Sequence, residues 1–187
     1  MTSLKAKIRA NKVIFTLLLF SFLLTNSSVK AQLVGGTTYS INGTQNPPSS
    51  FSTVANAFTY LNANGVSGSG VITLEIASGY TGESGVIPAL TPFVGMDATR
   101  PIVLKPASGQ TPTISTSPAA TSAVIRFNGV KYFTIDGSNN GTTSRNLTIT
   151  TTSTTTTVRL IDLVPTSTSS CKFITIKNVN LTGNSTT

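Results

Sequence analysis

The sequence predicts an all-β fold of stacked coils, with one short helix near the N-terminal end. Short β-branched runs recur along the chain, and each is closed by Asn, Asp, Gly or Pro, which favour turns. The later runs begin too close together for helices to lie between them, at residues 123, 132, 146, 158 and 173. No Asn-Gly or Asp-Gly turn of hairpin length joins consecutive runs, so strands that stack from coil to coil fit better than hairpins.

The first 31 residues are typical of a cleaved export signal. Four basic residues form its positive segment, namely Lys5, Lys7, Arg9 and Lys12. The apolar run Val13–Leu24 is shorter than the roughly 20 residues that a membrane-spanning helix needs. Val29-Lys30-Ala31 then offers a small-x-small cleavage site, so we expect cleavage between Ala31 and Gln32. The alternative, an uncleaved anchor, fits less well because the stretch Thr25–Lys30 is polar.

Between the signal and the coils, the sequence predicts a first strand at Thr37–Ile41, and Pro47-Pro48 then ends regular structure. A short helix is expected from about Phe51 to Ala63, capped by Ser49 or Ser50. Its apolar residues recur at helical spacing and are Phe51, Val54, Phe58 and Leu61. Asn64-Gly65 supplies a left-handed stop.

After the helix the apolar period changes to that of strands. The expected strands are Val71–Ile76, Pro101–Lys105, Ala123–Phe127, Tyr132–Asp136, Asn146–Thr150, Val158–Asp162 and Phe173–Lys177. Alternate apolar residues of the later strands should point inward as stacked ladders, namely Ile125, Phe127, Phe133, Ile135, Leu147, Ile149, Ile174 and Ile176. The expected parts are thus a signal peptide at 1–31, an N-terminal strand and helix at 32–70, and coils at 71–187.

The composition excludes several kinds of site. The chain has no histidine, which excludes histidine metal sites and histidine-based catalysis. Removal of the signal would lower the formal net charge from +8 to +3, and the remaining basic residues are scattered singly, so we expect no nucleic-acid partner. The lone Cys171 cannot form an internal disulfide and is expected to be a small buried hydrophobe. We expect neither a cofactor nor a metal.

Two segments, Tyr132–Ile149 and Phe173–Asn184, resemble right-handed parallel β-helix proteins of the pectin-lyase-like class. More narrowly, the chain resembles the N-terminal part of large repeat-bearing surface proteins that gliding-type Gram-negative bacteria export by the type IX route. Gly36–Ile41, the helix Phe51–Ala63 and Asn64–Gly68 resemble the opening of those proteins.

The resemblance implies a right-handed parallel β-helix whose short helix, at about 51–63, caps the first coil. It also implies secretion, or display on the outer cell surface of a Gram-negative bacterium. The family carries its sorting domain at the extreme C-terminus, and this chain ends at Asn184-Ser-Thr-Thr187 with no room for one. We therefore expect that the coils are truncated and that further coils of the same longer protein stack on them.

The acidic residues are Glu75, Glu83, Asp97, Asp136 and Asp162. Polysaccharide lyases and hydrolases on β-helices use clustered carboxylates with Arg or Lys. Asp136 and Asp162 could lie on neighbouring coils, with Arg126 or Arg159 nearby. The alternative, which we favour, is that Asp136 is a corner residue of an Asp-Gly turn and that Asp162 ends a strand. We therefore assign no catalytic residue.

The segment Thr142–Thr157 is rich in threonine. A flat threonine array on a β-helix could match a glycan or an ice lattice. We favour a solvated loop or a strand with outward hydroxyls, because the segment lacks a regular T-x-T repeat over several coils. Asn-x-Ser/Thr sequons matter only in a host that glycosylates them, and they occur at Asn42, Asn140, Asn146, Asn180 and Asn184.

These patterns favour a secreted or cell-surface module with a structural or adhesive role. Its expected partners are polysaccharides or other surface glycans, and no stable membrane span is expected once the signal is removed. The alternative is the N-terminal part of a polysaccharide-active lyase or hydrolase whose active groove lies outside this chain. A weaker third hypothesis is an ice or mineral binder.

Overall fold

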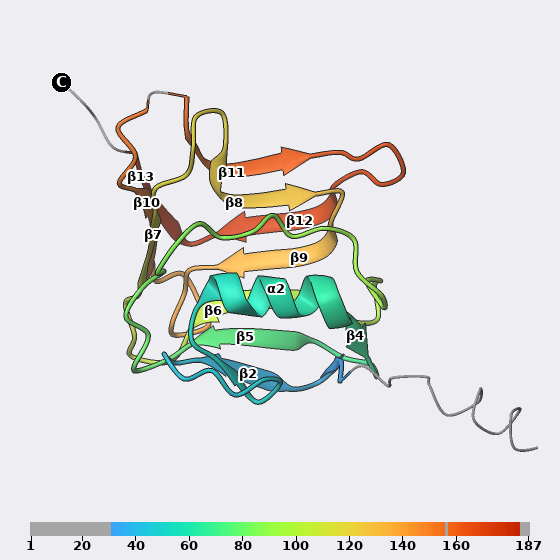
Figure 1. The fold of residues 1–187 in the computed structure, drawn as a ribbon. Coiled ribbons are helices and arrows are strands. Elements are labelled where there is room, and N and C mark those ends of the chain that lie inside the picture. The colour runs from blue at the N-terminus through green and yellow to red at the C-terminus, as the bar shows by residue number, and fades with distance from the viewer. Residues whose placement is uncertain (1–30, 156, 184–187) are drawn as a thin grey trace, which may run out of the picture. The chain divides into compact units, whose positions relative to one another are not determined.

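The computed structural model describes residues 31–155 and 157–183, and these residues are mostly strands (Figure 1). The elements in chain order are β1 Leu33–Val34, β2 Thr38–Ile41, β3 Ser50–Phe51, α2 Val54–Asn64, β4 Val66–Ser67, β5 Ile72–Ile76, β6 Ile102–Pro106, β7 Thr113–Thr116, β8 Ala123–Asn128, β9 Lys131–Asp136, β10 Leu147–Thr151, β11 Arg159–Val164, β12 Lys172–Lys177 and β13 Val179–Thr182. The signal peptide expected at 1–31 lies outside the described residues except for Ala31.

The strands form parallel sheets, and every pairing between named strands is parallel. The largest sheet has six strands in the order β12-β9-β6-β5-β2-β3, and the others have the orders β13-β10-β7, β11-β8 and β1-β4. From β7 onward consecutive strands enter different sheets: β8, β9 and β10 each join a separate sheet, and β11, β12 and β13 then pair with them in the same sequence. The all-β prediction is confirmed, and the pairing is parallel as expected.

Apolar side chains alternate with polar ones along the strands, and the in-register pairing stacks them into ladders. In the largest sheet Ile102 lies opposite Phe133 and Leu104 lies opposite Ile135. Because neighbouring strands are in register, the apolar positions fall on one face, which is the core. Six residues that the sequence predicts to point inward are buried: Ile125, Phe127, Phe133, Ile135, Leu147 and Ile149.

The last two predicted ladder positions are less buried than expected. Ile174 is half-buried, and Ile176 is 40% exposed, so the expectation that both lie in the core is wrong for Ile176. Both residues lie on β12, which is the edge strand of its sheet and has a paired neighbour, β9, on one side only. A side chain on an edge strand has packing partners along the ladder in one direction, which leaves part of its surface in contact with water.

Each strand expected from the sequence is present, with ends that differ by at most two residues. The sequence did not predict β1, β3, β4 and β7. Three of these have only two residues, and β7 contains a single apolar residue, Ile114, in the sequence Thr-Ile-Ser-Thr. Such strands carry too little periodicity to be detected locally, and they form because a neighbouring strand pairs with them.

The helix begins later than predicted. Thr53, not Ser49 or Ser50, is its N-cap, and its side chain accepts a hydrogen bond of 3.1 Å from the backbone N–H of Asn56. Phe51 is not helical, because Ser50–Phe51 pairs with β2 as strand β3. The predicted stop is confirmed: Gly65 has φ 71°, and its N–H donates to the carbonyl of Leu61.

The helix also lies in a different place from the cap that we expected. Its buried residue Phe58 packs with its ring centroid 6.3 Å from that of Phe127 and 5.9 Å from that of Phe133. These two residues belong to β8 and β9, which lie far along the stack from the first strands (Figure 1). The helix therefore fills the core beside the strands, and the expectation that it caps the first coil is wrong.

Within the described part of the chain, no helix combines the length and hydropathy that crossing a membrane requires.

Candidate functional site

Asp136 lies at the end of β9 and is fully engaged by its surroundings. Its Oδ1 accepts hydrogen bonds from the backbone N–H of Ser138 at 3.1 Å and from Nδ2 of Asn178 at 2.9 Å. Its Oδ2 lies 3.0 Å from Nζ of Lys177, the residue paired with it on β12. The interpretation of Asp136 as a corner residue is confirmed, and its carboxylate joins two neighbouring strands.

The pKa of Asp136 is lowered from its ordinary value. Burial opposes the charged form, but hydrogen bonds from Asn178 and Ser138 and the charge of Lys177 outweigh it. A lowered pKa means that the folded protein holds the charged form more favourably than the unfolded chain does. The resulting stability is complete above the unfolded pKa of about 3.9 and is lost as the pH falls through the folded pKa.

We therefore predict that wild-type protein loses more stability than Asp136→Asn as the pH falls below about 4. Urea unfolding of both proteins, followed by circular dichroism at several pH values, would measure the difference in their free energies of unfolding. That difference should shrink toward acid pH, because protonation removes the charge that the variant already lacks. A difference that stays constant across this range would contradict a stabilising charge on Asp136.

Asp162 lies within β11 and does not end a strand, so that part of our interpretation was wrong, and two basic side chains hold its carboxylate. Its Oδ2 lies 3.2 Å from the guanidinium of Arg126 on the paired strand β8 and 3.7 Å from that of Arg159 on its own strand. The side chain of Asp162 is 16% exposed. Asp136 and Asp162 belong to different sheets, and each is neutralised by basic partners, so their arrangement is that of cross-strand ion pairs. This arrangement offers no free acid and base.

The remaining carboxylates also have structural partners. Glu75 lies opposite Lys105 across β5 and β6, with 3.9 Å between the charged atoms, and Asp97 pairs with Arg100 in a turn. Among the described residues, no group of three or more His, Cys, Asp or Glu side chains is placed to hold a metal ion.

Cys171, expected to be buried, is half-buried, and its Sγ lies 3.3 Å from the carbonyl oxygen of Phe127.

Glu83 has a role that the sequence did not reveal. Its Oε1 accepts hydrogen bonds from the N–H of Val54 at 2.8 Å and from the hydroxyl of Tyr80 at 2.7 Å, and its Oε2 accepts one from the N–H of Ala55 at 3.0 Å. The carboxylate thus satisfies two free donors at the start of α2 and complements the helix dipole. Burial raises the pKa of Tyr80, and the charge and hydrogen bond of Glu83 raise it further.

An array of hydroxyl and amide side chains covers the outward face of the sheet β13-β10-β7. Its residues alternate with the ladder positions and pair in register, as two columns: Thr113, Thr148 and Asn180, and Ser115, Thr150 and Thr182. Neighbouring strands in a sheet lie about 4.8 Å apart, so the array presents polar groups at regular intervals. We call these six residues the hydroxyl face.

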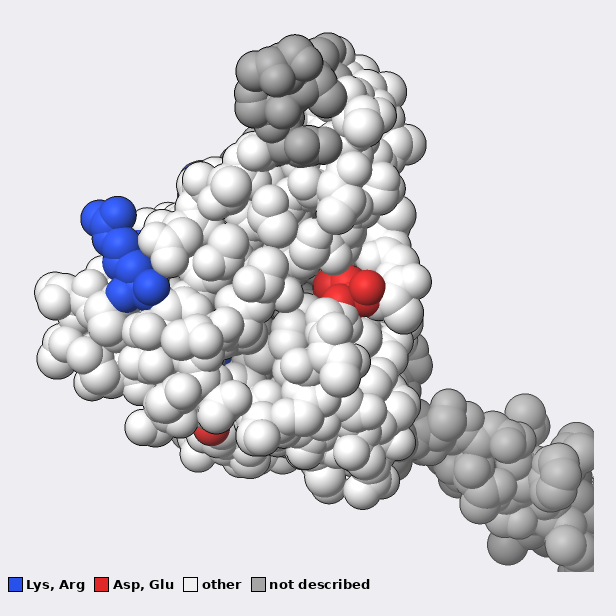
Figure 2. Space-filling model, turned by 90° about the vertical axis from the view of Figure 1, so that its left-hand side faces the viewer, with Lys and Arg blue, Asp and Glu red and all other residues white. Residues whose placement is uncertain are grey.

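The hydroxyl face carries no charge. None of the three strands contains a charged residue, and the side of the molecule on which they lie is almost free of charged side chains (Figure 2). The threonine-rich segment 142–157 contributes to it only through β10, whereas its residues 142–146 and 152–155 form no strand. The sequence hypothesis of outward hydroxyls on a strand is therefore right for β10, and β7 and β13 supply the flanking rows.

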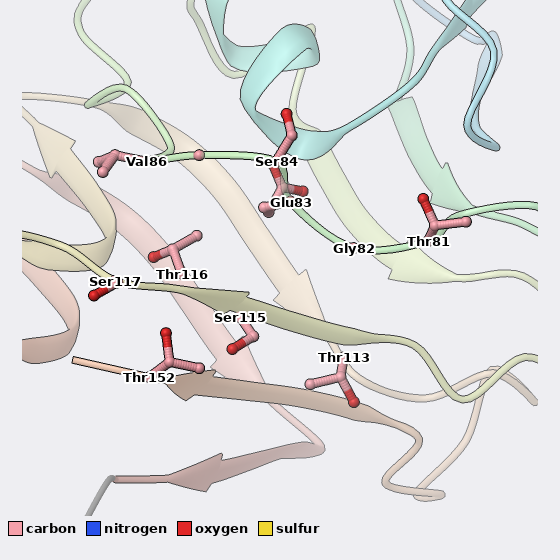
Figure 3. A pocket seen from close by; sticks show the side chains of 11 residues that line it. Thr81, Gly82, Glu83, Ser84, Val86, Thr113, Ser115, Thr116, Ser117 and Thr152 are labelled. Atoms are coloured by element: carbon pink, nitrogen blue, oxygen red, sulfur yellow. The ribbon is translucent and has the colours of Figure 1, made fainter. Parts of the chain in front are cut away.

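A groove lies beside the hydroxyl face, between the loop Thr81–Val86 and β7 (Figure 3). Its volume is about 520 Å³, and Thr113 and Ser115 belong both to it and to the hydroxyl face. Ser117 and Thr152 extend its polar wall. The volume falls within the range of about 300–1,000 Å³ that is usual for small-ligand sites.

No family model matches this chain, and no curated protein or solved structure matches it either.

Proposed function

We propose that this chain is a secreted or cell-surface β-helix module with a structural or adhesive role, and that its hydroxyl face contacts glycans. The observation that carries the proposal is the uncharged, in-register array on β7, β10 and β13. Sugar hydroxyls both donate and accept hydrogen bonds, as do Thr, Ser and Asn side chains, so the array is chemically complementary to a polysaccharide surface. Pairing with neighbouring strands holds it rigid, which lowers the entropic cost of binding.

The order in which the strands enter the sheets supports a right-handed parallel β-helix. β8, β9 and β10 join three different sheets in turn. β11, β12 and β13 then join the same three sheets in the same order, each next to the earlier strand, and each such round of three strands is one circuit. Parallel crossovers are right-handed in almost all proteins, which favours that hand here. Tyr132 and Phe173 occupy matching places on successive circuits, with φ of 56° and 57°, and their rings stack with centroids 4.7 Å apart.

Further coils of the same longer protein are part of the proposal. The strands β11, β12 and β13 are all edge strands of their sheets within the described residues. Apolar side chains on them remain exposed, with Leu163 at 46% and Leu181 at 54%. Edges of this kind favour addition of another strand, and a following coil would extend each ladder.

Export is proposed from the basic segment, the apolar run and the small-x-small site of residues 1–31. The first described strand begins at Leu33, directly after the expected new N-terminus Gln32. We predict that expression in a Gram-negative host gives a product that begins at Gln32. Mass spectrometry of the exported protein would measure this directly, and a product that retains Met1 would contradict the prediction.

Adhesion can be tested by incubating the purified chain with insoluble cellulose, chitin and pectin and measuring the bound fraction. Thr148→Val removes a central hydroxyl of the hydroxyl face while keeping a β-branched residue, so it should reduce binding. Thr134→Val is a matched control, because Thr134 occupies an outward position on β9, in a different sheet. Equal binding of both variants and wild type would contradict the proposed role of the hydroxyl face.

The same samples address the enzymatic alternative. The proposal expects no release of reducing ends or unsaturated uronates, because each carboxylate already has structural partners. Release that disappears in Asp136→Asn or Asp162→Asn would instead support a lyase or hydrolase.

A further inference from the structure

We infer that the groove between the loop Thr81–Val86 and β7 is a binding site for neutral, polyhydroxylated ligands, with neutral oligosaccharides as the chemical class. This inference rests on the proposed function, to which it adds a defined site and a selectivity for uncharged sugars. The groove adjoins the hydroxyl face and shares Thr113 and Ser115 with it.

The walls of the groove are rich in hydroxyl groups on both sides. The lining residues include Thr81 and Ser84 on the loop and Thr113, Ser115, Thr116 and Ser117 on the strand side. In Figure 3 the side chain of Thr116 points toward the loop, whereas those of Thr81 and Ser84 point away from β7. A hydroxyl group can donate one hydrogen bond and accept others, so such walls can follow the alternating donors and acceptors of a sugar chain. An apolar ligand would leave these groups without partners, at a cost in free energy for each one.

The charges around the groove disfavour an anionic ligand. Among the residues that the structure describes, no Lys or Arg lines it, and Glu83 is the one charged residue in its lining. The carboxylate of Glu83 accepts three hydrogen bonds, from Tyr80 and from the N–H groups of Val54 and Ala55. An acidic sugar would therefore meet a negative charge and find no cation to pair with, whereas a neutral sugar meets no such penalty.

The groove is held in shape by contacts outside it. Glu83, inside the loop, ties it to the start of α2. Beyond the C-terminal end of the loop, Ile87 is buried and Leu90 exchanges backbone hydrogen bonds with Arg126 and Asn128 of β8. The opposite wall, β7, is paired with β10. Because both walls are fixed before a ligand arrives, little ordering is required on binding.

Two glycines keep the loop side open. A Cβ atom added to Gly82 or Gly85 would meet no atom within 4 Å. Gly85 also has a backbone conformation that other residues adopt without strain, unlike Gly82 with φ +102°. Gly85 lines the groove, and an added side chain there has open space around it, so a large side chain at position 85 tests the groove without a clash at its Cβ.

The test uses the full chain and isothermal titration with cellohexaose, xylohexaose, maltohexaose and the acidic hexagalacturonate. We expect wild type to bind at least one neutral ligand at least about tenfold more tightly than hexagalacturonate. Gly85→Trp should weaken that binding by about tenfold or more, and Ser115→Ala should weaken it less. Ala98→Trp, at an exposed turn position that does not line the groove, is the control of equal bulk and should bind like wild type.

Circular dichroism and urea midpoints of all variants establish that each is folded, and Ser115→Ala provides a second test should Gly85→Trp be unstable. Preference for hexagalacturonate, or unchanged binding in both groove variants, would overturn the groove assignment. Binding to insoluble glycans that still depends on Thr148 would in that case leave the proposed function intact. Loss of binding to every soluble and insoluble glycan would overturn both.

Discussion

Phe58→Ala is expected to lower the free energy of unfolding by about 3–5 kcal/mol. Phe58 is completely buried on α2, and its ring meets those of Phe127 and Phe133, which are themselves 4.9 Å apart between centroids. Truncation removes the apolar surface that the ring buries and leaves a cavity among rings that are fixed on two strands. Because domains of this size are stable by only about 5–15 kcal/mol, the loss is a large share of the total.

Urea unfolding followed by far-ultraviolet circular dichroism would measure this loss, since the chain contains no tryptophan. Thr59→Ala is the matched control on the same helix, because Thr59 is exposed and its substitution should change stability by no more than about 0.5 kcal/mol. Hydrogen exchange adds a second readout: amides of β8 and β9 should lose protection in Phe58→Ala. A helix that served only as an end cap would leave those strands protected.

The helix shows what the sequence could and could not predict. Its apolar spacing and its glycine stop are local features, and they correctly predict a helix that ends before Gly65. Its beginning depends on β3, which forms because Ser50 and Phe51 pair with β2, and no local pattern reports that pairing. Its position in the core depends on contacts between Phe58 and residues about 70 positions further along the chain.

The candidate site likewise has local features that the sequence predicts and long-range contacts that it does not. The role of Asp136 follows from a local Asp-Gly turn, and the prediction was right. Glu83 was missed because its partners at the start of α2 lie 28 and 29 residues away in sequence. The sequence predicted only part of the hydroxyl face, because β7 has too little periodicity to be recognised as a strand. The alignment of β7 with β10 depends on the register of their pairing, which no local pattern reports.

The second large loss of stability is expected from Ile135→Ala, because this side chain is buried in an apolar ladder. Ile135 is completely buried on β9, with Leu104 opposite it on β6 and Ile176 opposite it on β12. Loss of its side chain should cost about 2–5 kcal/mol, because packed neighbours on both sides prevent the cavity from collapsing.

Ile176→Ala is the matched comparison, since it changes the same residue type at the same ladder position on the adjoining strand. Ile176 is 40% exposed and has one ladder neighbour, so less apolar surface is transferred to water and the gap is open to solvent rather than enclosed. Its cost should be less than half that of Ile135→Ala. Thermal and urea unfolding of the two variants would measure the ratio. Equal losses would mean that β12 is as deeply buried as β9 in solution, as it would be if another strand covered that edge, whereas negligible loss in both would show that the ladder does not form the core.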